Sequence, residues 1–337
     1  MSHQTRNPSI GIIGGGAWGT ALAQVMASDG SDVLLWAHES EVVAAINYDH
    51  ANPAFLPGIT LSPGIAATTA LADLDTCSLI LAVAPAQHLA ALLGQLSGHG
   101  QPIILCSKGM EQSTGRLMCE VAVDAGWSGP VAVLSGPTFA HEVGAGLPAA
   151  VTLACADEGV AEQLAKRIAR PMLRPYASTD VIGAEIGGVV KNVLAIACGV
   201  VDGAGLGQNA RAALISRGFA EMMRYGLARG ARMETLAGLA GLGDLVLTCS
   251  STSSRNFSLG HGLGKGRAAP ALLADRATVA EGAYSAAILV SDAARRGVDM
   301  PICAAVADLI AANISAKEAI TALLSRPLKR EGWASLD

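Results

Sequence analysis

The segment SIGIIGGGAWGTALA, residues 9–23, sets the architecture of the N-terminal half. Its first five residues are mostly apolar and predict a short buried strand, and the alanine-rich residues from Thr20 onward favour a helix. Gly14, Gly16 and Gly19 lie between them with the spacing GxGxxG. Gly14 permits a tight turn, Gly16 lets the backbone approach a pyrophosphate, and Gly19 lets the helix pack closely on the strand. Residues 32–36 follow as a second strand, so we expect a strand–helix–strand unit that binds a dinucleotide.

Short apolar runs recur along the first half of the chain and alternate with helix-compatible segments. They lie at residues 79–84, 103–106, 131–134 and 149–154. This alternation predicts a doubly wound α/β domain of the Rossmann type, with a mostly parallel sheet and helices on both faces.

After about residue 180 the strand-like runs end, and long helix-compatible segments take over at residues 184–201, 210–229 and 283–296. We therefore expect a dinucleotide-binding Rossmann-type domain over residues 1–183. An all-α domain that binds substrate and carries the catalytic residue is expected over residues 184–337, with a ligand cleft between the two.

Composition and charge restrict the class of protein. Of 337 residues, 51% are hydrophobic and 15% are charged, which suits two packed cores and excludes a disordered chain. The net charge is −5, and no lysine or arginine occurs between Arg6 and Lys108. This stretch lacks the clustered cations that a nucleic-acid surface needs. We expect no nucleic-acid partner.

The N-terminus and the cysteines bear on location. The first eight residues lack the apolar core of a signal peptide, and no apolar run reaches the ~20 uninterrupted residues that a membrane span needs. Seven cysteines are scattered without a CxxC pair, as expected in a reducing compartment, and they suggest no zinc site. We expect a cytoplasmic protein with no membrane span and no metal.

Polar residues follow several predicted strands, at the edge of the sheet where α/β domains bind ligands. Lys108 comes just after the strand at 103–106, and we expect it to face a ligand rather than bulk solvent. Gly136 and Thr138 follow the strand at 131–134 and offer a backbone contact and a hydroxyl.

The residues after the second strand normally distinguish NAD from NADP. An acid there accepts a hydrogen bond from the ribose 2′-hydroxyl, whereas a cation accommodates the 2′-phosphate. His38 and Glu39 occupy this position, and no arginine lies nearby. The sequence therefore leaves the choice between NAD and NADP open.

Lys191 is the sharpest feature of the second half. It lies in the apolar segment 186–196, where a lysine is either desolvated or extends its amine to water. Desolvation lowers the pKa of a lysine toward the range in which a general base works. Asn192, beside it, is costly to bury without a hydrogen-bond partner.

A second polar cluster begins at Asp244 and continues through Ser254, Arg255 and Asn256. An arginine flanked by small polar donors suits a phosphate or a carboxylate. Asp244 suits either of two roles, orienting a base or accepting a hydrogen bond from a substrate hydroxyl. An ordinary helix-capping loop is an equally good interpretation of this cluster.

Together these segments resemble the NAD(P)-dependent sn-glycerol-3-phosphate dehydrogenases of the bacterial biosynthetic type, from Ile10 to about Leu328. The most specific stretches are residues 14–23, 107–109, 135–140, 185–221, 241–256 and 280–282.

The resemblance implies roles for matching residues. It assigns the general acid/base to Lys191. The implied substrate contacts are Lys108, Gly136, Thr138, Lys191, Asp244, Ser254, Arg255 and Asn256. The implied cofactor contacts, beside the three glycines, are Trp18, His38, Lys108, Ala140, Arg255, Val279 and Glu281. Trp18 would either cover the cofactor or pack beneath the loop.

The resemblance also implies a reaction. In this family a hydride passes between C2 of sn-glycerol 3-phosphate and the nicotinamide of NAD or NADP, without a metal, and the product supplies phospholipid synthesis. A homodimer is one assembly left open. Two other functions also stay open: a β-hydroxyacid or 6-phosphogluconate type dehydrogenase, and a non-catalytic nucleotide-sensing protein.

Overall fold

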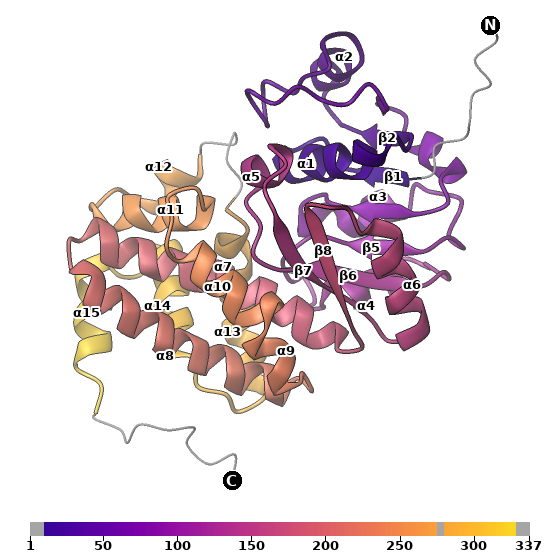
Figure 1. The fold of residues 1–337 in the computed structure, drawn as a ribbon. Helices are drawn as coiled ribbons and strands as arrows, with labels where there is room; N and C mark the ends of the chain where they lie inside the picture. The colour runs from indigo at the N-terminus through magenta and orange to yellow at the C-terminus, as the bar shows by residue number, and fades with distance from the viewer. Residues whose placement is uncertain (1–9, 275–279, 328–337) are drawn as a thin grey trace, which may run out of the picture. The chain divides into compact units, whose positions relative to one another are not determined.

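The computed structural model describes residues 10–274 and 280–327. The chain divides into two units, Met1–Glu185 and Ile186–Asp337. Figure 1 shows the strands in the first and, over the described residues of the second, helices alone. The α/β first half and the helical second half are those expected from the sequence.

A sheet of eight strands, counted over the described residues, forms the centre of the first unit, in the order β3-β2-β1-β4-β5-β6-β7-β8. The strands are β1 (Ile10–Ile13), β2 (Val33–Trp36), β3 (Ile65–Thr68), β4 (Ile80–Ala82), β5 (Ile103–Leu105), β6 (Val131–Ser135), β7 (Ala149–Cys155) and β8 (Leu173–Ser178). All neighbours run parallel except β6 and β7. Chain order reverses at β1, between β2 and β4, which is the switch point where doubly wound sheets bind ligands.

Two of these strands are absent from the sequence-based prediction, β3 and β8, and both lie at sheet edges. β3 reads Ile-Ala-Ala-Thr, and alanine has little preference for strands. β8 contains Pro175, which a strand tolerates at an edge because the missing N–H interrupts no internal ladder.

The helices of the first unit follow the strands in the α/β alternation. They are α1 (Ala17–Met26), α2 (Ser40–Asp49), α3 (Leu89–Leu93), α4 (Met118–Asp124), α5 (Ala140–Gly144) and α6 (Glu158–Ile168). A hydrophobic core cluster joins α1 to the sheet through fully buried residues such as Ile12, Leu22 and Leu35. Burial of each such side chain contributes about 1.5–3 kcal/mol, so α1 is held firmly behind the glycine-rich turn.

The second unit contains helices and no strand within its described residues. They are α7 (Val181–Gly203, which begins in the first unit), α8 (Gly207–Ala228), α9 (Met233–Ala237), α10 (Asp244–Thr248), α11 (Arg255–Gly264), α12 (Ala269–Leu273), α13 (Glu281–Arg295), α14 (Pro301–Ile310) and α15 (Ala316–Leu324). A single π-helical turn, Leu239–Gly243, precedes α10.

α7 is the central helix of this unit and is apolar nearly all round. By length and composition it could cross a membrane, but 89% of its most apolar window is buried inside the protein. It is therefore packed as a core helix. Burial on every side means that any polar group on α7 must find a partner within the protein.

Glycines let other segments approach α7 closely. A Cβ on Gly187 would lie 2.2 Å from the Ala240 carbonyl oxygen, and one on Gly199 would lie 2.1 Å from that of Phe257. Gly187 and Lys191 are four residues apart and so share one face of the helix. The contact at Gly187 therefore places the π-helical turn and α10 against the face that carries Lys191.

Two buried carboxylates bind the N-terminal turns of helices. Glu185 accepts from the Cys119 backbone N–H in α4 at 3.0 Å, and Glu221 accepts from the Ile302 N–H in α14 at 2.7 Å. Burial raises the pKa of both glutamates to about 7. Both carboxyl groups therefore titrate near neutral pH in the folded protein.

Candidate functional site

The glycine-rich turn has a separate steric requirement at each glycine. Gly14 has φ +120°, which favours glycine, and a Cβ on Gly19 would lie 1.8 Å from the Gly14 carbonyl oxygen. A Cβ on Gly15 would lie 2.5 Å from that of Ala37, the residue just after β2. At Gly16, the N-cap of α1, no atom lies within 4 Å of the Cβ position.

The turn is thus tight against α1 and β2, and open at Gly16. This opening lies at the N-terminus of a ten-residue helix, where backbone amides and the helix dipole favour an anion. These features fit the pyrophosphate of a dinucleotide.

The first unit also contains Trp18, His38 and Ala140, which are expected at the cofactor. Trp18 is half-buried and packs against the core cluster, as does Ala140 at the start of α5. His38 is exposed just after β2, as is Glu39, the N-cap of α2. Val279 lies outside the described residues.

Lys108, Gly136 and Thr138 meet beyond the carboxyl ends of β5 and β6. The Lys108 ammonium donates to the Gly136 carbonyl at 3.4 Å, and the Thr138 hydroxyl donates to the same oxygen at 3.3 Å. A Cβ on Gly136 would lie 2.9 Å from the Val151 α-carbon, so the close approach to β7 requires glycine. Lys108 and Thr138, 30 positions apart in the sequence, therefore belong to one polar cluster. This separation matches the ~30-residue length of a βαβ unit.

Lys191 is buried, with 7% of its surface exposed, and does not extend to solvent. Its Nζ donates to Asp244 Oδ1 at 2.8 Å and to Thr248 Oγ1 at 2.8 Å. Asp244 is fully buried, so its carboxylate charge is balanced by the ammonium.

Thr248 is a member of this cluster that the sequence analysis did not include. Its hydroxyl also donates to Asp244 Oδ1, at 3.2 Å. Asp244 and Thr248 are the first and last residues of α10 and share one face at i, i+4 spacing. That spacing was a signal available in the sequence.

The segment from Ser254 to Asn256 forms the start of α11. The buried Ser254 is its N-cap and accepts from the Phe257 N–H at 3.3 Å, so the capping interpretation holds for this side chain. Asn256 Oδ1 accepts from the Gly282 N–H at 2.9 Å, next to Glu281 at the start of α13. Arg255, at the first position of α11, is exposed.

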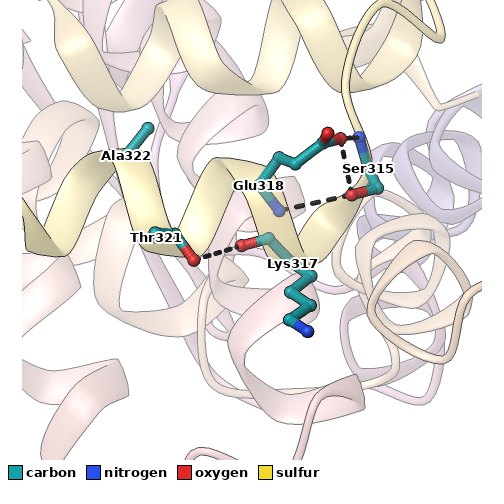
Figure 2. Close-up of a pocket in the computed structure, with 5 residues that line it drawn as sticks. All are labelled: Ser315, Lys317, Glu318, Thr321 and Ala322. Atoms are coloured by element: carbon teal, nitrogen blue, oxygen red, sulfur yellow. Dashed lines mark hydrogen bonds between the residues drawn. The ribbon is translucent and has the colours of Figure 1, made fainter.

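A pocket on α15 contains none of these residues. Ser315, Lys317, Glu318, Thr321 and Ala322 line it, and Figure 2 shows that their hydrogen bonds are local to the helix. Ser315 and Glu318 form a capping box, and the Thr321 hydroxyl donates to the Lys317 carbonyl. These are the bonds of a helix terminus.

Most of the predicted residues therefore form four groups: the glycine-rich turn, the cluster at Lys108, the cluster at Lys191 and the start of α11. The first two lie in the first unit, and the last two lie in the second. Over residues 10–274 and 280–327, no group of three or more histidine, cysteine, aspartate or glutamate side chains is placed to bind a metal.

The chain matches two family models and many known proteins. Residues 9–161 match the N-terminal model of NAD-dependent glycerol-3-phosphate dehydrogenase, and residues 180–321 match the C-terminal model. A glycerol-3-phosphate dehydrogenase [NAD(P)+] of Erythrobacter litoralis is 62% identical over 322 residues, covering 96% of this chain and 97% of that protein. One from Sphingopyxis alaskensis is 60% identical over 324 residues, covering 96% and 98%.

The fold agrees with these matches. The crystal structure of glycerol-3-phosphate dehydrogenase from Coxiella burnetii superposes with a TM-score of 0.89 at 37% identity, covering 94% of this chain and 98% of that one. Sequence and fold thus agree over both halves of the chain, and it belongs to the NAD-dependent glycerol-3-phosphate dehydrogenase family.

Proposed function

We propose that this protein reduces dihydroxyacetone phosphate to sn-glycerol 3-phosphate with NADH or NADPH, and catalyses the reverse oxidation. The observation that carries the proposal is the buried Lys191 ammonium, held 2.8 Å from both Asp244 Oδ1 and Thr248 Oγ1. The family relatives named above support the substrate and the cofactor.

The glycine-rich turn would hold the cofactor through the open position at Gly16 and the first amides of α1. Trp18, His38, Lys108, Ala140, Arg255, Val279 and Glu281 are the further cofactor contacts that we propose. When bound, the nicotinamide supplies or accepts the hydride.

Lys191 would transfer the proton. In the reductive direction its ammonium donates to the oxygen on C2 of the substrate, and in the oxidative direction its amine takes the hydroxyl proton. Asp244 and Thr248 would orient the Nζ atom toward that oxygen, which is the first of the two roles that the sequence allowed for Asp244. A positively charged ammonium would also polarise the substrate carbonyl.

Arg255 would bind the substrate phosphate, together with Asn256 and the N-terminus of α11. A guanidinium and helix amides both favour a dianion, and Asn256 retains its amide N–H groups as donors because its oxygen accepts from Gly282. Lys108, Gly136, Thr138 and Ser254 are the remaining substrate contacts that we propose. Because the phosphate does not react, its binding energy orients C2.

A steady-state assay tests the proposal. We expect oxidation of NADH or NADPH with dihydroxyacetone phosphate, and much slower oxidation with a panel of keto acids. Keto acids as the better substrates would favour the β-hydroxyacid or 6-phosphogluconate dehydrogenases. Cofactor binding without turnover of any substrate would favour a nucleotide-sensing protein. The same assay with both reduced cofactors determines the preference for NAD or NADP.

We further infer a cytoplasmic enzyme whose product supplies phospholipid synthesis. All seven cysteines carry no disulfide, which suits a reducing compartment. A homodimer is the assembly we would test, by sedimentation velocity on the full chain.

A further inference from the structure

Two buried side chains lie on the inner side of the glycine-rich turn. Thr20 is 0% exposed and Asn52 is 1% exposed. Asn52 Nδ2 donates to the Gly15 carbonyl oxygen at 2.8 Å and to Thr20 Oγ1 at 2.8 Å. The Thr20 hydroxyl donates to the Gly15 oxygen at 3.2 Å. Two donors from distant parts of the chain thus converge on one carbonyl of the turn.

Asn52 is itself fixed by the residues that follow it. Its side-chain Oδ1 accepts from the Phe55 N–H at 3.2 Å, and its backbone carbonyl oxygen accepts from the Leu56 N–H at 2.8 Å. Leu56 is buried and lies against Gly144 of α5, where a Cβ would come within 2.9 Å of Leu56 Cδ2. The donor that reaches Gly15 therefore belongs to a packed turn of the core.

The Gly15 carbonyl and the Gly16 N–H belong to one peptide group. That group is planar and trans, so its C=O and N–H point in opposite directions. With the carbonyl held toward the core by Asn52 and Thr20, the amide of Gly16 is directed away from the core. Gly16 is also the position with open space around its Cβ site.

We propose that Thr20 and Asn52 are positioning residues for the pyrophosphate of the cofactor. Three successive glycines have little intrinsic preference for one conformation, and ordering them upon binding would cost conformational entropy. The hydrogen bonds to Gly15 order the turn before the ligand arrives, and such preorganisation increases affinity. This inference rests on the proposed function, because it takes NAD(P)H as the ligand.

The test compares isosteric variants with matched controls on the full-length protein. T20V removes the hydroxyl at nearly constant volume, and N52L removes the amide. T20S retains the hydroxyl. N47A is the control for stability, because the Asn47 amide makes two similar bonds to the Ala67 backbone in β3, at 2.8 and 2.9 Å, away from the turn.

Titration with NADPH, NADH and ADP-ribose measures the effect without turnover. We expect T20V and N52L to raise the Kd of all three ligands about 5- to 30-fold, the loss of one or two hydrogen bonds. ADP-ribose carries the pyrophosphate without the nicotinamide. T20S and N47A should retain the wild-type Kd. In steady state, KM for the cofactor should rise in T20V while kcat at saturation stays near the wild-type value.

The outcomes separate the inference from the proposed function. Wild-type protein that binds none of the three ligands would contradict the proposed function and the inference together. Unchanged Kd values in T20V and N52L, with a binding wild type, would overturn the inference alone. An equal loss of affinity in N47A would also overturn it, since general destabilisation would then explain the effect. If T20V does not fold, N52L against N47A decides the question.

Discussion

At the scale of single residues, the mechanism that we propose depends on one buried cation. Lys191 lies in a helix that is apolar on nearly every side, and its ammonium is stabilised by one carboxylate and one hydroxyl from α10. An isolated buried charge would be strongly unfavourable, so the amine and the carboxylate of Asp244 must be considered as a pair. The same pairing that stabilises the charge also fixes the position of Nζ.

The first prediction concerns the amine itself. K191M keeps the length of the side chain and removes the charge, and we expect kcat to fall by about 10²- to 10⁴-fold, the usual contribution of a general acid/base. The Kd for NADH should stay at the wild-type value, as measured by fluorescence titration. Substantial turnover in K191M would contradict the assignment of the base.

The second prediction concerns Thr248. T248V removes the hydroxyl that contacts both Lys191 Nζ and Asp244 Oδ1, so we expect kcat to fall about 10-fold, as for the loss of hydrogen bonds to charged groups. The pH profile of kcat should shift, because one partner of the ammonium is lost. T248S should restore both values. A fall in stability alone, with kcat and its pH profile unchanged, would mean that Thr248 only stabilises α10.

At the scale of elements, close helix packing positions the groups that we propose to be catalytic. Glycines on α7 and α11 let backbones touch: a Cβ on Gly260 would lie 1.9 Å from the Ile196 carbonyl oxygen. Gly187 likewise lets the backbone of α7 contact the π-helical turn before α10, at the Ala240 carbonyl oxygen. Because helix backbones cannot yield by more than a few tenths of an ångström without other shifts, these contacts fix the spacing of α7, α10 and α11.

The third prediction tests this packing. G260A should lower the free energy of unfolding by about 2 kcal/mol or more, because the added methyl group overlaps a backbone oxygen rather than a flexible side chain. Urea denaturation measures the change. Gly100 is the matched control, since no atom lies within 4 Å of its Cβ position, and G100A should have little effect. Similar stability for both variants would show that the helices adjust at no cost.

At the scale of the whole molecule, buried carboxyl groups make stability depend on pH. Glu185 links α7 to α4, and Glu221 links α8 to α14. Burial raises their pKa values from 4.5 to about 7 in the folded protein. Between pH 4.5 and about pH 7, both carboxyl groups therefore keep their protons in the folded protein and lose them in the unfolded chain.

The fourth prediction follows from the sign of this difference. The stabilising contribution of these two groups to the free energy of unfolding is fully present below pH 4.5. It decreases as the pH rises from 4.5 to about 7, with a slope of up to ~1.4 kcal/mol per pH unit for each group, and it changes little at higher pH. The double variant E185Q/E221Q should show a flatter profile, because glutamine does not titrate. Denaturation between about pH 5 and about pH 8 measures it. E158Q, at an exposed glutamate, should keep the wild-type slope, and an unchanged slope in the double variant would contradict the prediction.

The sequence by itself was enough to predict the architecture, and it identified candidate residues for the chemistry. The GxGxxG turn between a strand and a helix, and the alternation that ends near residue 180, are local patterns set by backbone sterics and hydrophobic periodicity. They predicted the Rossmann-type half and the helical half, both confirmed. Lys191 could be selected because a cation in an apolar helix conflicts with its surroundings in the sequence itself.

Only the tertiary structure determined which groups meet. Asn52 lies 37 positions after Gly15, and Asp244 lies 53 positions after Lys191, so no local pattern relates them. The edge strands β3 and β8 also form through pairing with a neighbour rather than through their own weak preference. The physical reason is the same in each case: hydrogen bonds and close packing act over a few ångströms in space, and the folded chain alone brings distant positions within that range.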